Sequence, residues 1–268
     1  SARPQSGLHL ADIVYEVLAE GDITRFVAIF QSQTTEVVGP VRSMRPYFVE
    51  LGMAADAILV HAGWSQAAMN LMTKHKWNHL DEVYGDHAFY WRDKSRKAPH
   101  NVYTSTELMT KGAETRKFRE EWSAVRLTFA KPGDPPLQGE PAVKATIPYI
   151  GKYEVVYEYD AEAGVYLRTM AGKPHEDKET GERIKAANVL IVEAKHKVVD
   201  KVGRREVNVQ GPGKGYLLQG GVKTPITWKL KDGAIRAYQD EAATKEIPLL
   251  PGKTWVQIVP DAGKAAFS

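Results

Sequence analysis

The feature that most constrains the fold is a series of short strand-like runs in the second half of the sequence. After residue 143 the chain alternates between turn segments and runs such as YEVVYEYD, NVLIVEAKHKVV and TWVQIV. Runs rich in β-branched and aromatic residues, bounded by turn residues, are typical of strands. Asp232-Gly233, between two such runs, is a strong hairpin signal. We therefore predict a mainly antiparallel β domain over residues 143–268.

The first half mixes helical and strand-like patterns. Apolar residues at helical spacing predict a helix over residues 8–19, and further helices are expected from Ser43 and Ser65. Apolar runs at 23–30 and 57–62 predict strands that flank a single helical crossover, which would make them neighbours in one sheet. A capping box at Thr104 predicts another helix, and a strand is expected at 125–129.

A Pro- and Gly-rich stretch separates the two halves. Residues 131–142 read KPGDPPLQGEPA, a composition typical of a linker. We predict an α/β (α+β) protein with an N-terminal helix-covered mixed-sheet domain over 1–131, a linker over 132–142 and the β-rich domain over 143–268.

Three arginines in one stretch of the first half point to a binding site. Arg25 lies in a strand that is apolar on both faces, where an unpaired arginine is rare. Arg42 and Arg45 come next, beside a predicted helix start, and guanidinium groups near a helix N-terminus suit an anion. In the alternative interpretation, each arginine pairs with an upstream carboxylate. Those carboxylates are Asp12, Glu16 and Glu20.

Other polar residues of the first half are expected around the same site. His61 ends a short predicted strand, followed by a glycine turn and a helix, an arrangement that places groups at a sheet edge. Residues 75–104 lack periodicity and predict a long ordered loop, whose polar tips are Arg92, Arg96, His100 and Asn101. The histidines of this segment do not follow a recognised ligand spacing, so we predict no bound metal.

Composition excludes several classes of protein. The 36 basic and 33 acidic side chains are too balanced for a general nucleic-acid binder. The chain has no cysteine and no apolar run of about 18 residues, which excludes disulfides and argues against a membrane span. It carries no phosphate-binding loop, dinucleotide fingerprint or nucleophile elbow, so we expect no cofactor.

Several motifs resemble those of a known family. ARPQSGLHLADIVYEVLAEGDITRFVAIF, VGPVRSMRPYF, DAILVHAGWS and APHNVYTS are similar, in this order, to the YerB-like family of predicted bacterial lipoproteins, whose function is unknown. Asp22 stands where a glycine is usual, and Trp64 replaces a smaller residue. The resemblance implies an extracytoplasmic protein held at the cell membrane by a lipid that is absent from this chain.

Three functions remain open from the sequence. The first is an envelope-associated binding protein that holds a phosphate or carboxylate through the arginines. The second is an enzyme that acts on an envelope polymer or a pyrophosphate-linked lipid, with Arg42 and Arg45 stabilising negative charge. The third is a protein-interaction module that presents its β domain to a partner.

Overall fold

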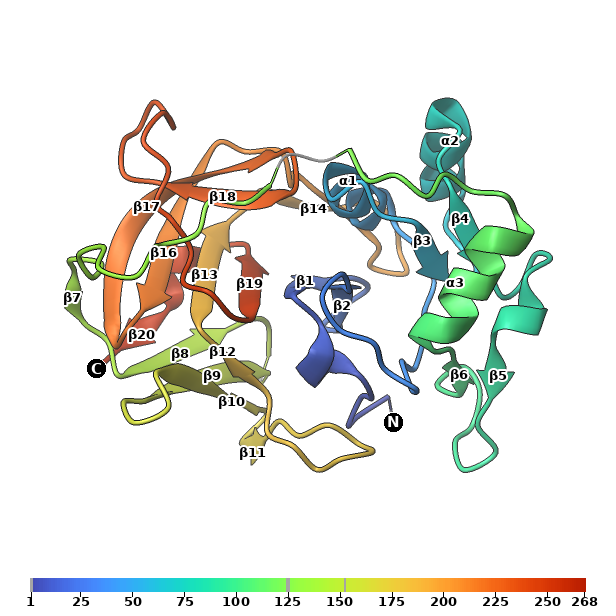
Figure 1. Ribbon diagram of the computed structural model, residues 1–268, viewed down its shortest axis with the longest axis horizontal. Coiled ribbons are helices and arrows are strands. Elements are labelled where there is room, and N and C mark those ends of the chain that lie inside the picture. Colours follow the sequence, from blue (N-terminus) through green and yellow to red (C-terminus); the bar gives the residue numbers. More distant parts are fainter. Residues whose placement is uncertain (1, 124–125, 152) are drawn as a thin grey trace. The chain divides into compact units, whose positions relative to one another are not determined.

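The computed structural model describes all residues except 1, 124, 125 and 152 (Figure 1). Its contacts divide the chain into two units. The first comprises Ser1–Asp12, Ile29–Ala124 and Glu176–Glu182, and the second comprises Ile13–Ala28, Val125–His175 and Arg183–Ser268. The chain has few helices and many strands in several sheets, which confirms the predicted α+β class. The predicted linker at 132–142 stays a prediction.

The larger sheet of the second unit joins strands from both ends of the sequence. Its strand order is β18-β17-β16-β13-β19-β1-β2, with β7 paired to β17. Strand β19 pairs in parallel with β1 and with β13, whereas β16, β17 and β18 pair antiparallel. The strands are β1 (Ile13–Leu18), β2 (Thr24–Ile29), β7 (Glu140–Pro141), β13 (Asn188–Glu193), β16 (Gly213–Gln219), β17 (Val222–Lys231), β18 (Ala234–Tyr238) and β19 (Thr254–Val259).

The predicted helix over residues 8–19 is wrong. Only Leu8–Leu10 is helical, as the 3-10 turn η1, and Ile13–Leu18 forms strand β1. Every residue of β1 is buried, so the apolar run fits a central strand covered on both faces. Glu16, one of the predicted carboxylate partners of the arginines, lies in this strand and is fully buried.

A second sheet completes this unit and confirms the strand-rich pattern after residue 143. Its order is β11-β10-β9-β8-β20, with β12 paired to β10. The predicted hairpin is also confirmed, because Asp232 and Gly233 connect β17 to β18. The elements are β8 (Lys144–Pro148), β9 (Glu154–Asp160), β10 (Val165–Met170), β11 (Lys173–Pro174), β12 (Lys185–Ala186), η3 (Ala262–Lys264) and β20 (Ala266–Phe267).

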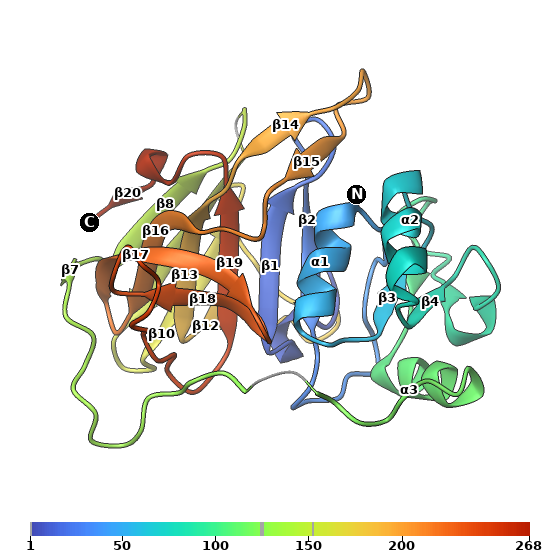
Figure 2. The same cartoon turned by 90° about the horizontal axis from the view of Figure 1, so that it is seen from above.

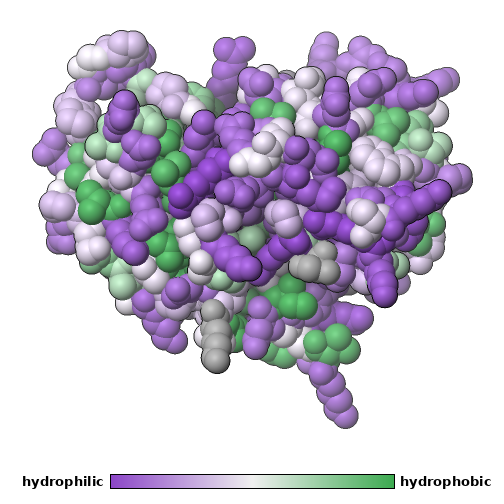
Figure 3. Space-filling model, turned by 90° about the horizontal axis from the view of Figure 1, so that it is seen from below, coloured by the Kyte–Doolittle hydropathy of each residue, from purple (hydrophilic) through white to green (hydrophobic). Residues whose placement is uncertain are grey.

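A small hairpin of the second unit projects from its sheets. It pairs β14 (His196–Val198) with β15 (Arg205–Val207), and its turn reaches the upper edge of Figure 2. Figure 3 views the molecule from the opposite side and shows hydrophobic side chains beside hydrophilic ones on the protrusion at its lower edge.

The first unit contains the α-helices and two short pairs of strands. Strands β3 (Leu59–His61) and β4 (His79–Asp81) are parallel, and β5 (Trp91–Arg92) and β6 (Val102–Tyr103) are antiparallel. The helices are α1 (Pro46–Ala54), α2 (Gln66–His75), the 3-10 turn η2 (His87–Phe89) and α3 (Thr106–Thr115). Leu80, Phe89, Tyr90 and Val102 form a local core.

Local sequence signals account for the helix starts. Pro46 occupies the first turn of α1, where a missing N–H costs nothing. Ser65 caps α2 as predicted. The cap of α3 lies one residue later than predicted, because the hydroxyl of Ser105 accepts from the Leu108 N–H.

Two predictions about strands of the first half need correction. The strands predicted at 23–30 and 57–62 are not neighbours, because β2 pairs with β1 whereas β3 pairs with β4. Pairing of β2 with β1 is favourable because β1 is a six-residue buried strand, whereas β3 has only three residues. Of the strand predicted at 125–129, Val125 lies outside the described residues, and Phe129 forms an isolated bridge with Leu249. No described helix is long and apolar enough to cross a bilayer.

Candidate functional site

The loop over residues 92–101 folds back onto the segment that carries Arg42. The Val41 N–H donates to the Val102 carbonyl over 2.7 Å, and Val38 forms a bridge with Thr104. The Arg42 guanidinium donates to the Pro99 carbonyl. Residues separated by more than 50 positions in the sequence thus come together, as the sequence led us to expect for Arg42 and this loop.

Arg42 and Arg96 concentrate positive charge near His100 in the first unit. Arg96 donates to the Pro4 carbonyl over 2.6 Å. Burial lowers the pKa of His100 from its usual value, and the guanidinium groups of Arg42 and Arg96 lower it further. Both arginines therefore lie within electrostatic reach of the imidazole.

The hydroxyl of Tyr103 is a buried donor next to this charge. Tyr103 is only 1% exposed, and burial raises its pKa whereas Arg96 and Lys178 lower it. In the described part of the chain, neither the Tyr103 hydroxyl nor Nδ1 of His100 has a hydrogen-bond partner. Buried polar atoms are normally satisfied, so these two atoms are exceptions among the described residues. Arg42, Arg96, His100 and Tyr103 are called the basic cluster below.

The nearby carboxylates are engaged by a different cation. Nζ of Lys178 lies 2.8 Å from a carboxylate oxygen of Glu179 and 3.6 Å from one of Asp93. Hydrogen bonds from Ser95 lower the pKa of Asp93, and the charge of Lys178 lowers it to a smaller extent. These acidic groups are held by Lys178 and by backbone turns.

Arg92 and Asn101 lie at the base of the same loop but are already engaged. The Arg92 guanidinium forms a bidentate pair with Glu82, with distances of 2.8 and 2.9 Å from one nitrogen to the two oxygens. Its second terminal nitrogen lies 3.4 Å from the amide oxygen of Asn101. Arg92, predicted as a polar tip of the loop, thus has Glu82 and Asn101 as partners.

Arg45 is buried at the start of α1 and does not extend from the surface. Its side chain donates to the Met44 carbonyl over 2.8 Å, and the residue is 8% exposed. The position is the cap of α1, which lacks a side-chain cap hydrogen bond. Arg45 is thus enclosed by its own turn, whereas Arg42 reaches the loop.

His61 belongs to a buried histidine pair and does not lie on an open rim. Nε2 of His61 lies 3.2 Å from Nδ1 of His79, and Nδ1 of His61 lies 3.0 Å from the Gly63 carbonyl. Asp81 is 3.7 Å away and also binds the Gly63 N–H. Burial lowers the pKa of His61 to about 4, against the opposing effect of Asp81. The pair is therefore neutral at pH 7.

The remaining predicted residues have structural partners of their own. Arg25 pairs with Glu20 over 2.8 Å in the second unit, so its predicted carboxylate partner is observed. Asp12 binds the N–H groups of Gln31 and Ser32 in the first unit. Glu16 binds Arg168 inside the second unit, a partner 152 residues away that the sequence did not indicate.

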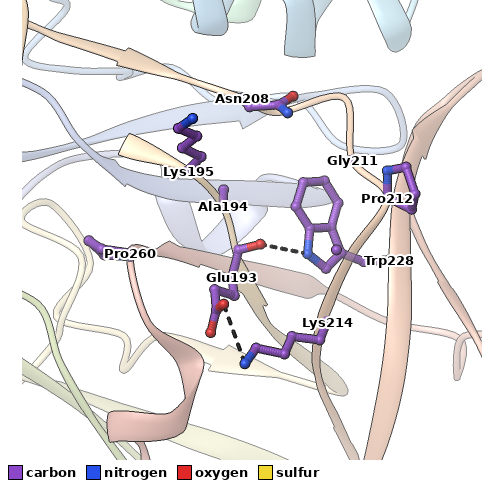
Figure 4. A pocket seen from close by; sticks show the side chains of 10 residues that line it. Glu193, Ala194, Lys195, Asn208, Gly211, Pro212, Lys214, Trp228 and Pro260 are labelled. Carbon is purple, nitrogen blue, oxygen red and sulfur yellow. Dashed lines mark hydrogen bonds and ion pairs between the residues drawn. The ribbon is translucent and has the colours of Figure 1, made fainter. Parts of the chain in front are cut away.

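A shallow pocket in the second unit offers mixed charge. It has a volume of about 400 Å³ and lies where the β14–β15 hairpin leaves the sheet (Figure 4). Nζ of Lys214 lies 3.5 Å from the carboxylate of Glu193. The backbone carbonyl of Glu193 accepts from the indole N–H of the buried Trp228. The lining also contains Lys195, so it combines one carboxylate with two ammonium groups. Among the described residues, no group of three or more His, Cys, Asp or Glu is placed to hold a metal ion.

Comparisons with known proteins identify relatives for the whole chain. Two family models match, the N-terminal domain of a protein of unknown function (DUF3048) over residues 1–119 and its C-terminal domain over residues 145–256. The chain is 41% identical over 268 residues to "Putative lipoprotein YerB" of Bacillus subtilis (strain 168), covering all of this chain and 80% of that protein. The crystal structure of YerB protein from Bacillus subtilis matches with a TM-score of 0.89 and 40% identity, covering 100% of this chain and 89% of that one.

Proposed function

The chain belongs to the DUF3048 family, and from the basic cluster of its first unit we propose that it binds an anionic ligand outside the cytoplasmic membrane. The observation that carries the proposal is the pair of buried polar atoms without hydrogen-bond partners, the Tyr103 hydroxyl and Nδ1 of His100, beside Arg42 and Arg96. Phosphate and carboxylate oxygens accept from such groups, and planar guanidinium donors suit them.

The name of the relative supports the proposed location. A lipoprotein is held at the membrane by its lipid, and the YerB relative carries that description. We therefore propose that this chain is displayed at the outer face of a cell membrane and that its ligand is a phosphate- or carboxylate-bearing envelope component. Protection of the full-length protein from protease added to intact protoplasts would contradict this location.

The test of binding uses two kinds of variant. Arg42→Ala with Arg96→Ala removes two charges of the basic cluster, and Lys74→Ala with Lys111→Ala removes two exposed charges from α2 and α3 of the same unit. Titration with glycerol phosphate, inorganic phosphate and acetate is followed by calorimetry. We expect binding to disappear in the first double variant and to persist in the second. Equal loss in both would mean non-specific attraction and would contradict a site.

Tyr103→Phe is the sharper variant because it removes only one oxygen. A hydrogen bond to a charged group contributes about 1.5–3 kcal/mol, so affinity should fall by roughly 10- to 100-fold. The melting temperature should not fall, since the lost hydroxyl has no hydrogen-bond partner in the described residues. Tyr84→Phe, at a position that is 63% exposed in the same unit, is the matched control and should bind as the parent does. Unchanged affinity in Tyr103→Phe would remove the hydroxyl from the site.

A further inference from the structure

An exposed aliphatic surface in the second unit lies at the tips of two adjoining turns. One is the end of the β14–β15 hairpin, where Val198 ends β14 and Val199 and Val202 lie in the turn, exposed by 52%, 45% and 64%. The other is the turn between β1 and β2, with Ile23 exposed by 62%. These four residues are called the aliphatic tip. Scattered apolar side chains on a surface are ordinary, but here they gather on the ends of two loops.

The two turns are fixed to each other by hydrogen bonds. The Gly21 N–H donates to the Gly203 carbonyl over 3.2 Å, and Arg205 donates to the Gly21 carbonyl over 2.9 Å. Gly203 has a φ of +82°, and a Cβ there would lie 2.9 Å from the nitrogen of Gly21. Glycine thus permits the close approach of the loops, and the aliphatic tip is a single surface.

Basic side chains outnumber acidic ones in the two turns that carry the aliphatic tip. Residues 195–206 contain five basic and two acidic side chains. One of the acids, Asp200, accepts from the N–H groups of Val202 and Arg204 and pairs with the Arg204 guanidinium at 3.3 Å. The other, Glu206, faces Lys197 at 4.0 Å with both side chains largely exposed. The β1–β2 turn adds Glu20 and Asp22, and Glu20 pairs with Arg25 at 2.8 Å. Residues 19–25 and 195–206 together contain six basic and four acidic side chains, so an approaching surface meets a net charge of +2.

Protruding aliphatic groups beside a net positive charge match one kind of partner. Apolar side chains flanked by Lys and Arg enter the boundary between headgroups and acyl chains of a bilayer, and the cations contact anionic lipids. A stable protein partner requires about 1,000 Å² or more of complementary surface, which two narrow turns do not offer. We propose that the aliphatic tip docks on an anionic lipid bilayer and orients the second unit against the membrane. This inference does not depend on the proposed anion-binding function.

The experiment measures vesicle binding by the recombinant chain of residues 1–268. Vesicles of phosphatidylcholine with about one third phosphatidylglycerol are compared with vesicles of phosphatidylcholine alone, in a sedimentation assay. We expect binding to the anionic vesicles that weakens as salt is raised. Val198→Asp with Val202→Asp should reduce it by about tenfold or more, because each change places a carboxylate at the interface.

Matched variants distinguish docking through the aliphatic tip from non-specific adsorption to vesicles. Val143→Asp alters an aliphatic residue that is 54% exposed elsewhere in the same unit and should leave binding unchanged. Lys197→Ala with Lys201→Ala should weaken binding by roughly fivefold per charge. Circular dichroism and melting curves verify that every variant folds. A tip variant that fails to fold is replaced by Val198→Ser with Val202→Ser, for which a smaller loss in the same direction is expected.

Two results would overturn the proposal. One is absent vesicle binding, or equal binding by the tip variant and by Val143→Asp. The other is a concentration-dependent dimer in analytical ultracentrifugation that the tip variant abolishes while vesicle binding is absent, which would assign the aliphatic tip to a second copy of the chain.

Discussion

Replacing Arg168 by methionine should strongly destabilise the second unit. Arg168 and Glu16 are both fully buried and form an ion pair. The same carboxylate accepts from the Thr24 hydroxyl over 2.7 Å and from the Tyr153 hydroxyl over 2.5 Å. The guanidinium also lies over the ring of Trp255, at 4.5 Å from its centroid. Methionine keeps much of the side-chain volume but leaves Glu16 without its counter-ion.

The size of the loss follows from the burial of both partners. Burial is the largest single effect and lowers the pKa of Arg168, but Glu16, Tyr157 and Tyr153 together raise it by more, so the net shift is upward and the guanidinium stays charged. Removing one partner of a buried ion pair costs about 3–5 kcal/mol, because the other charge remains in a medium that solvates it poorly. For a chain of this size, that loss lowers the melting temperature by roughly 6–20 °C.

Two further variants test the reasoning through urea unfolding monitored by tryptophan fluorescence. Glu16→Gln with Arg168→Met removes both charges and should be less destabilised than Arg168→Met alone, since no unpaired charge is then buried. Arg204→Met breaks the exposed pair with Asp200 in the same unit and should cost less than about 1 kcal/mol. If Arg168→Met cost no more than Arg204→Met, or if the double variant were the least stable, the assignment of an energetic ion pair would be refuted.

Two other predictions concern the first unit. The unfolded chain protonates His61 near pH 6.5, whereas burial lowers the pKa of the folded imidazole to about 4, so stability should fall by roughly 3 kcal/mol as the pH drops between these values. Urea unfolding at pH 7 and pH 4 would measure that loss, and His61→Gln should reduce it; the same loss in the variant would contradict the assignment. Gly39→Ala should cost about 1–3 kcal/mol, because the new Cβ would lie 2.5–2.9 Å from three ring carbons of Tyr103. A melting temperature equal to that of the parent would contradict this prediction and show that the Tyr103 ring moves away at little cost.

Local signals in the sequence were sufficient for the elements whose neighbours are close along the chain. Asp232-Gly233 specifies a hairpin whatever the rest of the sheet does, and Ser65 caps α2 from its own first turn. Strand β1 shows where such reasoning fails. The spacing of its apolar residues fits a helix as well as a strand, and the choice is made by β19, which lies some 240 residues later. The partner of Glu16 could not be predicted from the sequence for the same reason, because Arg168 lies 152 residues away.

The candidate site shows the same division between local and long-range information. The arginines of the first half were recognised by residue type, and the contact between Arg42 and the 92–101 loop was expected from the lack of periodicity in that loop. Sequence did not distinguish Arg42 from Arg45, because burial against the Met44 carbonyl is decided by the path of the chain before α1. Tyr103 was overlooked because a tyrosine in an apolar strand carries no sign of an unsatisfied hydroxyl. Only burial reveals it.

The two proposals rest on different units, and that separation makes their tests informative about each other. Arg42, Arg96 and Tyr103 belong to the first unit, whereas the aliphatic tip belongs to the second. A soluble phosphate ligand should therefore bind the tip variant as well as it binds the parent chain. Conversely, vesicle binding that survives Arg42→Ala with Arg96→Ala would show that the tip supplies the attraction by itself. If that double variant lost vesicle binding and soluble anions did not bind the parent, the anion held by the basic cluster would be the lipid headgroup. The first unit would then be a second membrane contact and not a ligand site of its own.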